Sequence, residues 1–207
     1  MIDLYYWPTP NGHKISIALE EMGLDYQVFP INILKDDQFQ PDFLKISPNN
    51  KIPAILDQDG PNGKSISIFE SGAILQYLGR KTGLFYPEDE TKRVHVEQWL
   101  MWQMGGFGPM LGQNHHFSRF APERIAYATN RYVDETKRLY AVLNQQLVGQ
   151  DYVAGEYSIA DMAIFPWILR HEWQQINLED YPQVQAYMQR IEARPAVQRA
   201  LAIEVNR

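Results

Sequence analysis

Asn49-Asn50-Lys51-Ile52-Pro53-Ala54 and Phe69-Glu70-Ser71-Gly72-Ala73-Ile74-Leu75 are the two stretches that decide the fold of this chain. In the first, Ile52 precedes Pro53 at the expected start of a strand, and an X–Pro bond can be cis. A cis bond there turns the N–H and C=O of Ile52 outward, where they can pair with an extended peptide as an added strand does. The first stretch therefore predicts an edge that receives a peptide.

Glu70 and Ser71 open the second stretch at the expected start of a helix. A helix N-terminus offers N–H donors and positive dipole charge, which suit an anion. Ser71 adds a hydroxyl and Glu70 can take an ammonium group, so the pair predicts a seat for the α-amino-acid end of a small peptide. Glu-Ser before a helix is also a common N-cap, and this alternative stays open.

The first 80 or so residues alternate strand and helix signals. Short apolar or aromatic runs predict strands, and a 3.6-residue apolar period predicts helices. The expected strands are 2–7, 26–31, 54–57 and 65–69, and the expected helices are 12–22, 39–46 and 71–81. This order predicts an α/β thioredoxin-like layer, a mixed four-stranded sheet with helices on its faces.

Beyond the last of these helices the strand signals disappear. Gly83 and Pro87 mark a linker. Long helical patterns follow at about 89–114, 122–148, 158–169, 183–193 and 195–202. We therefore expect a thioredoxin-like domain over 1–82 that binds the peptide, a linker over 83–88, and an all-helical bundle over 89–207 with a second-substrate site.

Tyr157-Ser158-Ile159-Ala160-Asp161 places a serine three residues before an aspartate at the start of an apolar run. This is a variant of the capping box, with Asp in place of Glu. We expect Ser158 to cap the helix and Asp161 to bond back to the Ser158 N–H. The pair is assigned to folding and not to chemistry.

The composition bounds the possible functions. The chain has 207 residues, of which 45% are hydrophobic, and a net charge of −6. This charge argues against a general affinity for nucleic acid or an anionic membrane. No apolar run approaches the length needed to cross a bilayer, and the N-terminus carries no basic region typical of a signal peptide. The expected location is the cytoplasm.

The chain contains no cysteine. This excludes structural disulfides, thiolate metal sites and a nucleophilic thiol of the protein itself. His115-His116 is the other pattern that could suggest a metal site, but adjacent residues on a helix point about 100° apart and are poor co-ligands. We expect no metal.

Three motifs carry a family resemblance: Thr9-Pro10-Asn11-Gly12-His13-Lys14, Ser47-Pro48-Asn49-Asn50-Lys51-Ile52-Pro53-Ala54 and Gly112-Gln113-Asn114-His115-His116-Phe117. With them the whole chain resembles the cytosolic glutathione transferases, within these the Nu class. That class includes bacterial disulfide-bond oxidoreductases and is similar to the transferase-like domain of a yeast prion regulator. The resemblance implies glutathione as cosubstrate, a homodimer, and a small disulfide as second substrate.

The loop after the first strand, Trp7–His13, contains neither cysteine nor serine, so a reactive sulfur must come with the ligand. Lowering the pKa of a thiol by about two units takes roughly 2.7 kcal/mol, which two hydrogen bonds to the anion can supply. Asn11 and Thr9 can donate them, and the resemblance implies that both face the glutathione sulfur. From the residues alone, Asn11 is also a candidate N-cap.

Tyr5 and Tyr6 compete for this role, because a tyrosine at the end of the first strand activates the thiol in other transferase classes. Successive strand residues face opposite ways, so at most one can point at the loop. We expect both to pack in or beside the sheet, and the Nu-class resemblance favours this.

The remaining predicted glutathione contacts also depend on the resemblance. Gln38 resembles the residue that binds the glycine end of glutathione, and Arg131 is expected to hold a carboxylate of a second glutathione. Lys51 can pair with the glycine carboxylate. The complete predicted binding set is Asn11, Gln38, Lys51, Ile52, Pro53, Glu70, Ser71 and Arg131.

The leading hypothesis is a glutathione-dependent disulfide-bond oxidoreductase that places a bound thiolate beside a disulfide. It holds one glutathione and an entering disulfide, or two glutathiones side by side. One alternative is conjugation, in which the same thiolate attacks an electrophilic carbon. Another is a non-enzymatic glutathione-binding or regulatory protein, because fold does not fix function.

Overall fold

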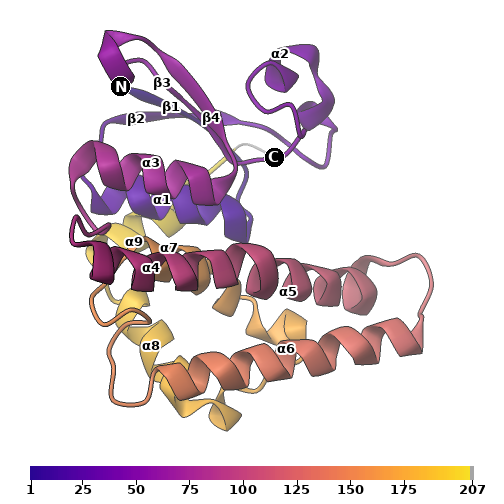
Figure 1. The fold of residues 1–207 in the computed structure, drawn as a ribbon. Coiled ribbons are helices and arrows are strands. Elements are labelled where there is room, and N and C mark those ends of the chain that lie inside the picture. Colours follow the sequence, from indigo (N-terminus) through magenta and orange to yellow (C-terminus); the bar gives the residue numbers. More distant parts are fainter. Residues whose placement is uncertain (206–207) are drawn as a thin grey trace. The chain divides into compact units, whose positions relative to one another are not determined.

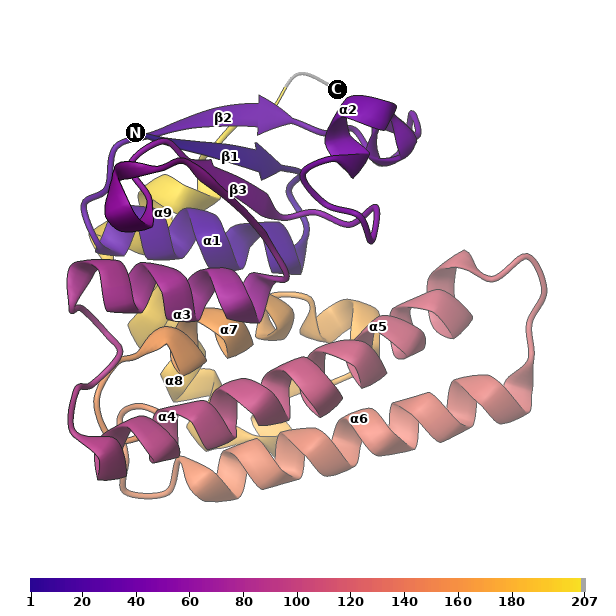
Figure 2. The same ribbon diagram turned by 45° about the horizontal axis from the view of Figure 1, so that its top comes forward.

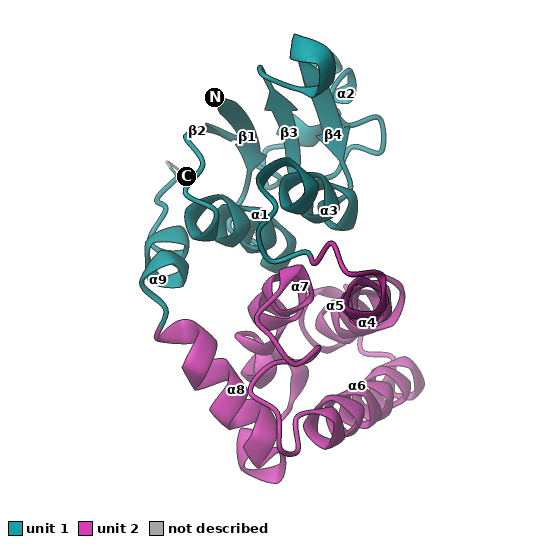
Figure 3. Ribbon diagram, turned by 60° about the vertical axis from the view of Figure 1, so that its left-hand side comes forward, with its two compact units in different colours: residues 1–86, 194–207 teal, residues 87–193 magenta. Residues whose placement is uncertain are grey.

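The structure is a computed structural model that describes residues 1–205 and contains two compact units. Unit 1 comprises Met1–Tyr86 and the chain from Arg194 onward, and unit 2 comprises Pro87–Ala193 (Figure 3). The boundary lies inside the stretch 83–88. In the described part, no helix combines the length and apolar character that a membrane span needs.

Unit 1 contains a four-stranded sheet (Figure 1), with the strand order β2-β1-β3-β4 that Figure 3 shows. Its strands are β1 (Ile2–Tyr6), β2 (Tyr26–Pro30), β3 (Ala54–Asp57) and β4 (Ile66–Phe69). Strand β1 pairs with β2 in parallel and with β3 antiparallel, and β3 pairs with β4 antiparallel. The predicted mixed sheet of a thioredoxin-like layer is confirmed.

Two helices of unit 1 lie side by side against one face of this sheet, α1 (Pro10–Glu21) and α3 (Ser71–Thr82) (Figure 2). The apolar positions of α1 are buried because they face the sheet and α3. A short helix, α2 (Pro41–Leu44), lies beyond the ends of β1 and β2. The layer thus leaves one end of the sheet bordered by loops and helix starts.

Helix α9 (Pro195–Leu201) groups with unit 1, although its place in the sequence put it in the helical part over 89–207. It packs on α1, and two ion pairs join the segments. Arg194 Nε lies 2.6 Å from Glu21 Oε1, and Arg199 Nε lies 2.7 Å from Glu20 Oε2. These pairs link residues at opposite ends of the chain, which local periodicity does not report.

Unit 2 is all-helical. Its α-helices are α4 (Glu90–Trp102), α5 (Gly108–His115), α6 (Ala126–Gln146), α7 (Ile159–Ile168) and α8 (Pro182–Glu192). The continuous pattern expected over 89–114 is interrupted by a π-helical turn at Gln103–Phe107. Gly108 follows it, where a Cβ would lie 2.5 Å from the Gln103 side chain and 3.3 Å from the Trp167 ring. A side chain at this position would require the Gln103 amide to shift.

The capping box of α7 is confirmed. The Oγ of Ser158 accepts from the Ala160 N–H at 3.3 Å, and Asp161 Oδ2 accepts from the Ser158 N–H at 2.8 Å. Asp161 also accepts from the Val153 N–H and the Tyr187 hydroxyl, each at 2.9 Å. The carboxylate is fully buried and joins three segments of unit 2.

Candidate functional site

The strand register brings the predicted site residues of unit 1 to one end of the sheet. Tyr5 at the end of β1 lies opposite Ala54 at the start of β3, and Ala54 lies opposite Phe69 at the end of β4. Strand β2 runs parallel to β1 and ends at Pro30 beside Tyr6. The segments that leave or enter at this end carry Thr9, Asn11, Gln38, Lys51, Ile52, Pro53, Glu70 and Ser71.

Thr9 caps helix α1, so the interpretation of Asn11 as the N-cap is wrong. The Oγ1 of Thr9 accepts from the Gly12 N–H at 3.2 Å, and Pro10 occupies the first helical position, where proline is favoured. The Thr9 hydroxyl hydrogen can still be donated, because the cap uses only the oxygen. Asn11 is the second helical residue and is half-buried, which places its amide in the first turn.

Gly12 explains how this turn lies so close to the strand. A Cβ at Gly12 would lie 2.1 Å from the carbonyl oxygen of Trp7 and 3.1 Å from the ring of Tyr6. A side chain at this position would push the start of α1 away from the end of β1. The glycine therefore allows the first turn of α1, with Thr9 and Asn11, to lie close to the end of β1.

Both tyrosines of β1 pack in or beside the sheet. Tyr6 is fully buried, and its hydroxyl lies 3.1 Å from Nδ1 of His13. The ring of Tyr5 stacks on Phe29, with centroids 5.3 Å apart. Burial, and then the charge of Asp3, raises the pKa of Tyr5. The Tyr6 hydroxyl already contacts His13 and the Tyr5 ring packs on Phe29, so neither arrangement favours a tyrosine as the group that activates a thiol.

The Ile52–Pro53 bond is cis. Among residues 1–205, no group of the chain hydrogen-bonds the N–H or the C=O of Ile52. The hydroxyl of the buried Ser47 donates to the Lys51 carbonyl oxygen at 2.8 Å and fixes the preceding loop. Ile52 thus presents one backbone donor and one acceptor at the entry to β3, as peptide pairing requires.

Glu70 and Ser71 form the start of α3. Glu70 is the N-cap residue with φ 71° and ψ 112°, and its side chain makes no capping hydrogen bond. A positive φ in a residue other than glycine is strained, and such strain is typical of ligand sites. Its carboxylate is exposed and lies 3.5 Å from Nδ2 of Asn49. With no acidic residue in the first turn of α3, the N-terminus retains its preference for an anion.

Lys14 is a site residue that the sequence reasoning missed. Its side chain is 1% exposed, and its Nζ lies 3.4 Å from the Oγ of Ser71. Burial lowers the pKa of Lys14 to about 7, against the opposing effect of Glu70. A lysine inside the apolar run of α1 was the available signal, since such a residue needs a reason to be buried.

Gln38 and Lys51 differ in the exposure of their side chains and in their hydrogen bonds. Gln38 is half-buried, and its Nε2 donates to Asp36 Oδ1 at 3.4 Å. Its Oε1 is buried and has no hydrogen-bond partner in the described part of the chain. Lys51 is exposed. The structure therefore gives Gln38 an unmet acceptor at this end of the sheet and leaves Lys51 in solvent.

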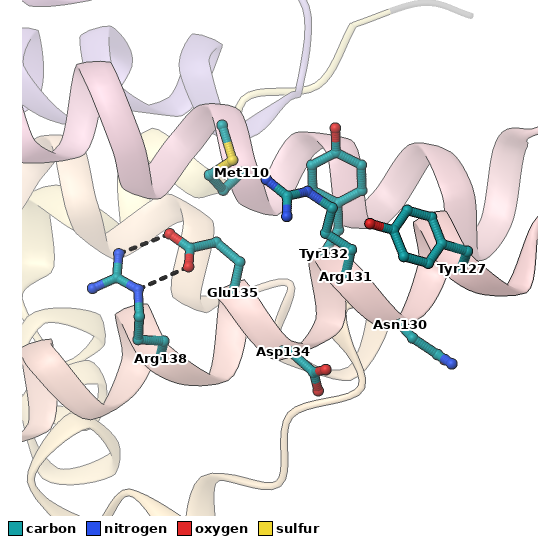
Figure 4. A pocket seen from close by; sticks show the side chains of 8 residues that line it. All are labelled: Met110, Tyr127, Asn130, Arg131, Tyr132, Asp134, Glu135 and Arg138. Atoms are coloured by element: carbon teal, nitrogen blue, oxygen red, sulfur yellow. Dashed lines mark hydrogen bonds and ion pairs between the residues drawn. The ribbon is translucent and has the colours of Figure 1, made fainter.

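Arg131 lies in unit 2, on α6, and so is not placed relative to the residues above. It lines a cavity of about 640 Å³ together with Met110 of α5. Figure 4 shows Arg131 and Glu135 on the same side of α6, and two hydrogen bonds of 2.7 Å join Glu135 to Arg138. In residues 1–205, Arg131 has no hydrogen bond or ion pair. The hydrogen bond from Arg138, and less strongly the charge of Arg131, lower the pKa of Glu135.

The two adjacent histidines occupy different environments. His115 is 8% exposed, whereas His116 is exposed. Burial, then Arg170 and Arg119, lowers the pKa of His115 to about 4. No group of three His, Asp or Glu side chains in the described residues could hold a metal ion.

Comparison with known protein families identifies the family of this chain. Residues 1–80 match the family described as "Glutathione S-transferase, N-terminal domain", and residues 109–195 match "Glutathione S-transferase, C-terminal domain". The chain belongs to the glutathione S-transferase family. The expected resemblance to that family is confirmed, and its two domain types follow each other in the usual order.

Similar proteins of this transferase family include a named oxidoreductase. Disulfide-bond oxidoreductase YfcG of Escherichia coli is 54% identical over 97% of this chain and 94% of its own length. The protein URE2 of Saccharomyces bayanus is 31% identical over 93% of this chain and 67% of its own length. The predicted relation to bacterial oxidoreductases and to the yeast regulator is confirmed.

Solved structures of similar transferases contain glutathione. A glutathione transferase family member from Pseudomonas fluorescens, with two glutathione bound, has a TM-score of 0.94 and 45% identity, covering 98% of this chain and 93% of its own. A glutathione transferase from Pseudomonas putida, with one glutathione disulfide bound per subunit, has a TM-score of 0.94 and 46% identity, covering 98% and 91%.

Proposed function

We propose that the protein is a glutathione-dependent disulfide-bond oxidoreductase of the Nu class. The observation that carries this proposal is the start of α1: Thr9 caps the helix, Asn11 lies in its first turn, and the chain contains no cysteine. The site thus offers donors to a sulfur anion but supplies no sulfur. The name of YfcG supports this reaction, and the glutathione-bound relative supports glutathione as the ligand.

In this proposal, the γ-glutamyl end of glutathione lies at the start of α3. Its carboxylate accepts from the N-terminus of α3 and from Ser71, and its ammonium group pairs with Glu70. Its backbone pairs with Ile52 at the entry to β3, where Pro53 sets the cis bond. Each group of the ligand then has a partner of opposite charge or complementary hydrogen bonding.

The glycine end of glutathione extends toward Gln38 and Lys51. The unpartnered Oε1 of Gln38 is an acceptor for a peptide N–H. The Lys51 ammonium pairs with the glycine carboxylate. Because Lys51 is exposed, we expect its contribution to be small, at about 0–1 kcal/mol.

The central sulfur then lies near Thr9 and Asn11, which donate to it as a thiolate. The thiolate attacks one sulfur of the substrate disulfide, the S–S bond breaks, and the leaving thiolate takes a proton from water. A second glutathione resolves the mixed disulfide, giving glutathione disulfide and a second thiol. The protein contributes placement and anion stabilisation, and no residue of the chain is oxidised.

Arg131 is proposed to hold a carboxylate of the second glutathione. Its support is the resemblance together with the cavity of about 640 Å³ that Arg131 lines in unit 2. Glu135, on the same side of α6, makes its ion pair with Arg138, and the Arg131 charge also acts on it.

We also propose a cytoplasmic homodimer. Helix α4 exposes Val94 and Met101, which lie two helical turns apart on one face, at 40% and 50%. Tyr127 on α6 is 78% exposed. Exposed apolar side chains of this size are typical of subunit interfaces. A chain without cysteine is compatible with a reducing compartment.

Conjugation remains the second candidate because the family matched is the transferases. The test is turnover of 2-hydroxyethyl disulfide with glutathione beside conjugation of 1-chloro-2,4-dinitrobenzene, on wild type, Asn11→Ala and the isosteric Asn11→Asp. We expect strong disulfide reduction, weak conjugation, and a loss of about 10²-fold in both variants. Conjugation that dominates and is insensitive to Asn11 would contradict the proposal. Glutathione binding without either activity would favour a binding protein.

A further inference from the structure

Two arginines of unit 2 lie over one tryptophan ring. The guanidinium carbon of Arg119 is 4.6 Å from the ring centroid of Trp173, and that of Arg170 is 4.9 Å from it. Arg119 belongs to the π-helical turn that follows α5, and Arg170 follows α7. Two segments 51 residues apart in the sequence therefore bring like charges to within about 10 Å of each other, a distance at which they repel.

No carboxylate of the described chain neutralises these two charges. Across residues 1–205, neither guanidinium makes a hydrogen bond or an ion pair. Arg190 of the same unit shows the usual arrangement: it lies 6.0 Å from the Tyr152 ring centroid and also pairs with Asp151 at 2.9 Å. An arginine that lies over an aromatic ring can therefore also have a carboxylate partner, which Arg119 and Arg170 do not have.

His115 adds an unmet polar group to the same cluster. Its ring lies edge-on to Trp173, with centroids 5.7 Å apart. Its Nε2 is buried, and no hydrogen-bond partner exists for it among the described residues. The charges of Arg170 and Arg119 contribute to its lowered pKa, so both arginines lie near it. The cluster has positive charge, an aromatic surface and an unsatisfied imidazole.

Of the cluster's residues, Arg119 also lines a cavity. Arg119 lines a hollow of about 280 Å³ with Ser118 and Gln175, whose side chains are joined by a 3.1 Å hydrogen bond. Arg124 and Glu123 also line it, so its rim carries one acid among its basic residues. The volume is at the lower end of small-molecule sites, which suits a short acid and not a nucleotide.

We propose that Arg119 and Arg170 bind a carboxylate of the entering disulfide and make the enzyme prefer acidic disulfides over neutral ones. Guanidinium groups are the side chains best suited to a carboxylate, because their planar N–H donors match its two oxygens. The ring of Trp173, which both guanidinium groups contact, holds the two arginines near each other. This assignment rests on the proposed function, since it takes unit 2 to receive the disulfide.

The test compares two disulfides in which each sulfur carries two methylene groups and the end groups differ. 3,3′-Dithiodipropionate ends in carboxylates and 2-hydroxyethyl disulfide ends in hydroxyls. We expect kcat/KM for the acidic disulfide to fall about tenfold or more in Arg119→Gln and in Arg170→Gln, because each loses a charge-assisted hydrogen bond. The rate with the neutral disulfide should change less than about twofold, as for a surface substitution. Arg119→Lys, which keeps the charge, should lose less.

Arg190→Gln is the matched control, because it removes an arginine that lies over an aromatic ring but already has a carboxylate partner. It should leave both rates unchanged. Equal losses with both disulfides in the Arg119 and Arg170 variants would overturn the proposal and give the arginines a structural role. A wild type that reduces both disulfides equally would also overturn it, while leaving the proposed function intact.

If the wild type reduces neither disulfide, the proposed function fails first, and calorimetric binding of 3,3′-dithiodipropionate to wild type and to the double variant decides the site. Binding that the double variant loses would retain the carboxylate site without the reaction. Equal binding by both proteins, or none by either, would overturn it.

Discussion

Helices α3 and α7 start in opposite ways. At α7, Ser158 and Asp161 accept from the helix and the preceding chain, and the carboxylate is fully buried. At α3, the N-cap Glu70 makes no capping bond and the first turn contains no acid. Both helices have the same dipole and the same N–H donors. The start of α3, where we propose an anion site, differs from that of α7 in that its first turn contains no acid.

The largest expected effect is a loss of stability on changing Asp161, the acid at the start of α7. Asp161→Ala should lower the free energy of unfolding by about 3–5 kcal/mol, because it leaves buried backbone N–H groups of Val153 and Ser158 without acceptors. Urea unfolding measures this, with Asp151→Ala as an exposed control. The folded fraction should bind glutathione as the wild type does. A loss below about 1 kcal/mol would mean that α7 does not depend on its own acid.

The next largest effect concerns Lys14, the buried lysine next to Ser71 at the start of α3. The pKa of Lys14 is lowered from 10.5 to about 7, so the unfolded state binds more protons between these values and stability rises with pH there. From pH 7 to pH 9, wild type should gain about 2 kcal/mol of unfolding free energy relative to Lys14→Met. Lys45→Met removes an exposed lysine and serves as the control. Parallel pH curves for wild type and Lys14→Met would show that Lys14 titrates normally.

A substitution at Ala73 would make the start of α3 resemble that of α7. Ala73 is the third helical residue of α3 and is exposed. Ala73→Asp places an acid where α7 has Asp161. We expect it to weaken binding of S-methylglutathione about tenfold, since the new carboxylate repels that of the ligand and accepts from the same N–H groups. Ala73→Asn is the uncharged control. Unchanged affinity in Ala73→Asp would place the ligand carboxylate elsewhere.

The smallest effect is expected for Glu70→Gln. Removing this exposed charge should weaken S-methylglutathione about fivefold, because its pairing with the ligand ammonium is screened by water. Glu156→Gln, an exposed acid of unit 2, should have no effect. Isothermal calorimetry measures both. Tighter binding by Glu70→Gln would mean that this carboxylate repels the ligand and does not pair with it.

Local patterns in the sequence predicted the mixed sheet, most helices and the capping box of α7, because each depends on residues that are close in the chain. The strand order then gathered Ile52, Glu70 and their neighbours at one end. Asn11 was one candidate for the cap of α1, and the cap is Thr9, for which Pro10 after Thr9 was the signal. Helix α9 and the contacts of Trp173 depend on segments far apart in sequence, which periodicity does not report.

The central claim is that the open end of unit 1 stabilises a sulfur anion brought by the ligand, and the most direct measurement is the pKa of the bound thiol. Thiolate absorbance near 240 nm, followed against pH with glutathione saturating the protein, reports it without turnover. We expect the bound thiol to titrate about two units below a free thiol, which titrates near 8.5, and most of this shift to be lost in Asn11→Ala. A bound thiol that titrates as it does in water, in both proteins, would contradict the claim.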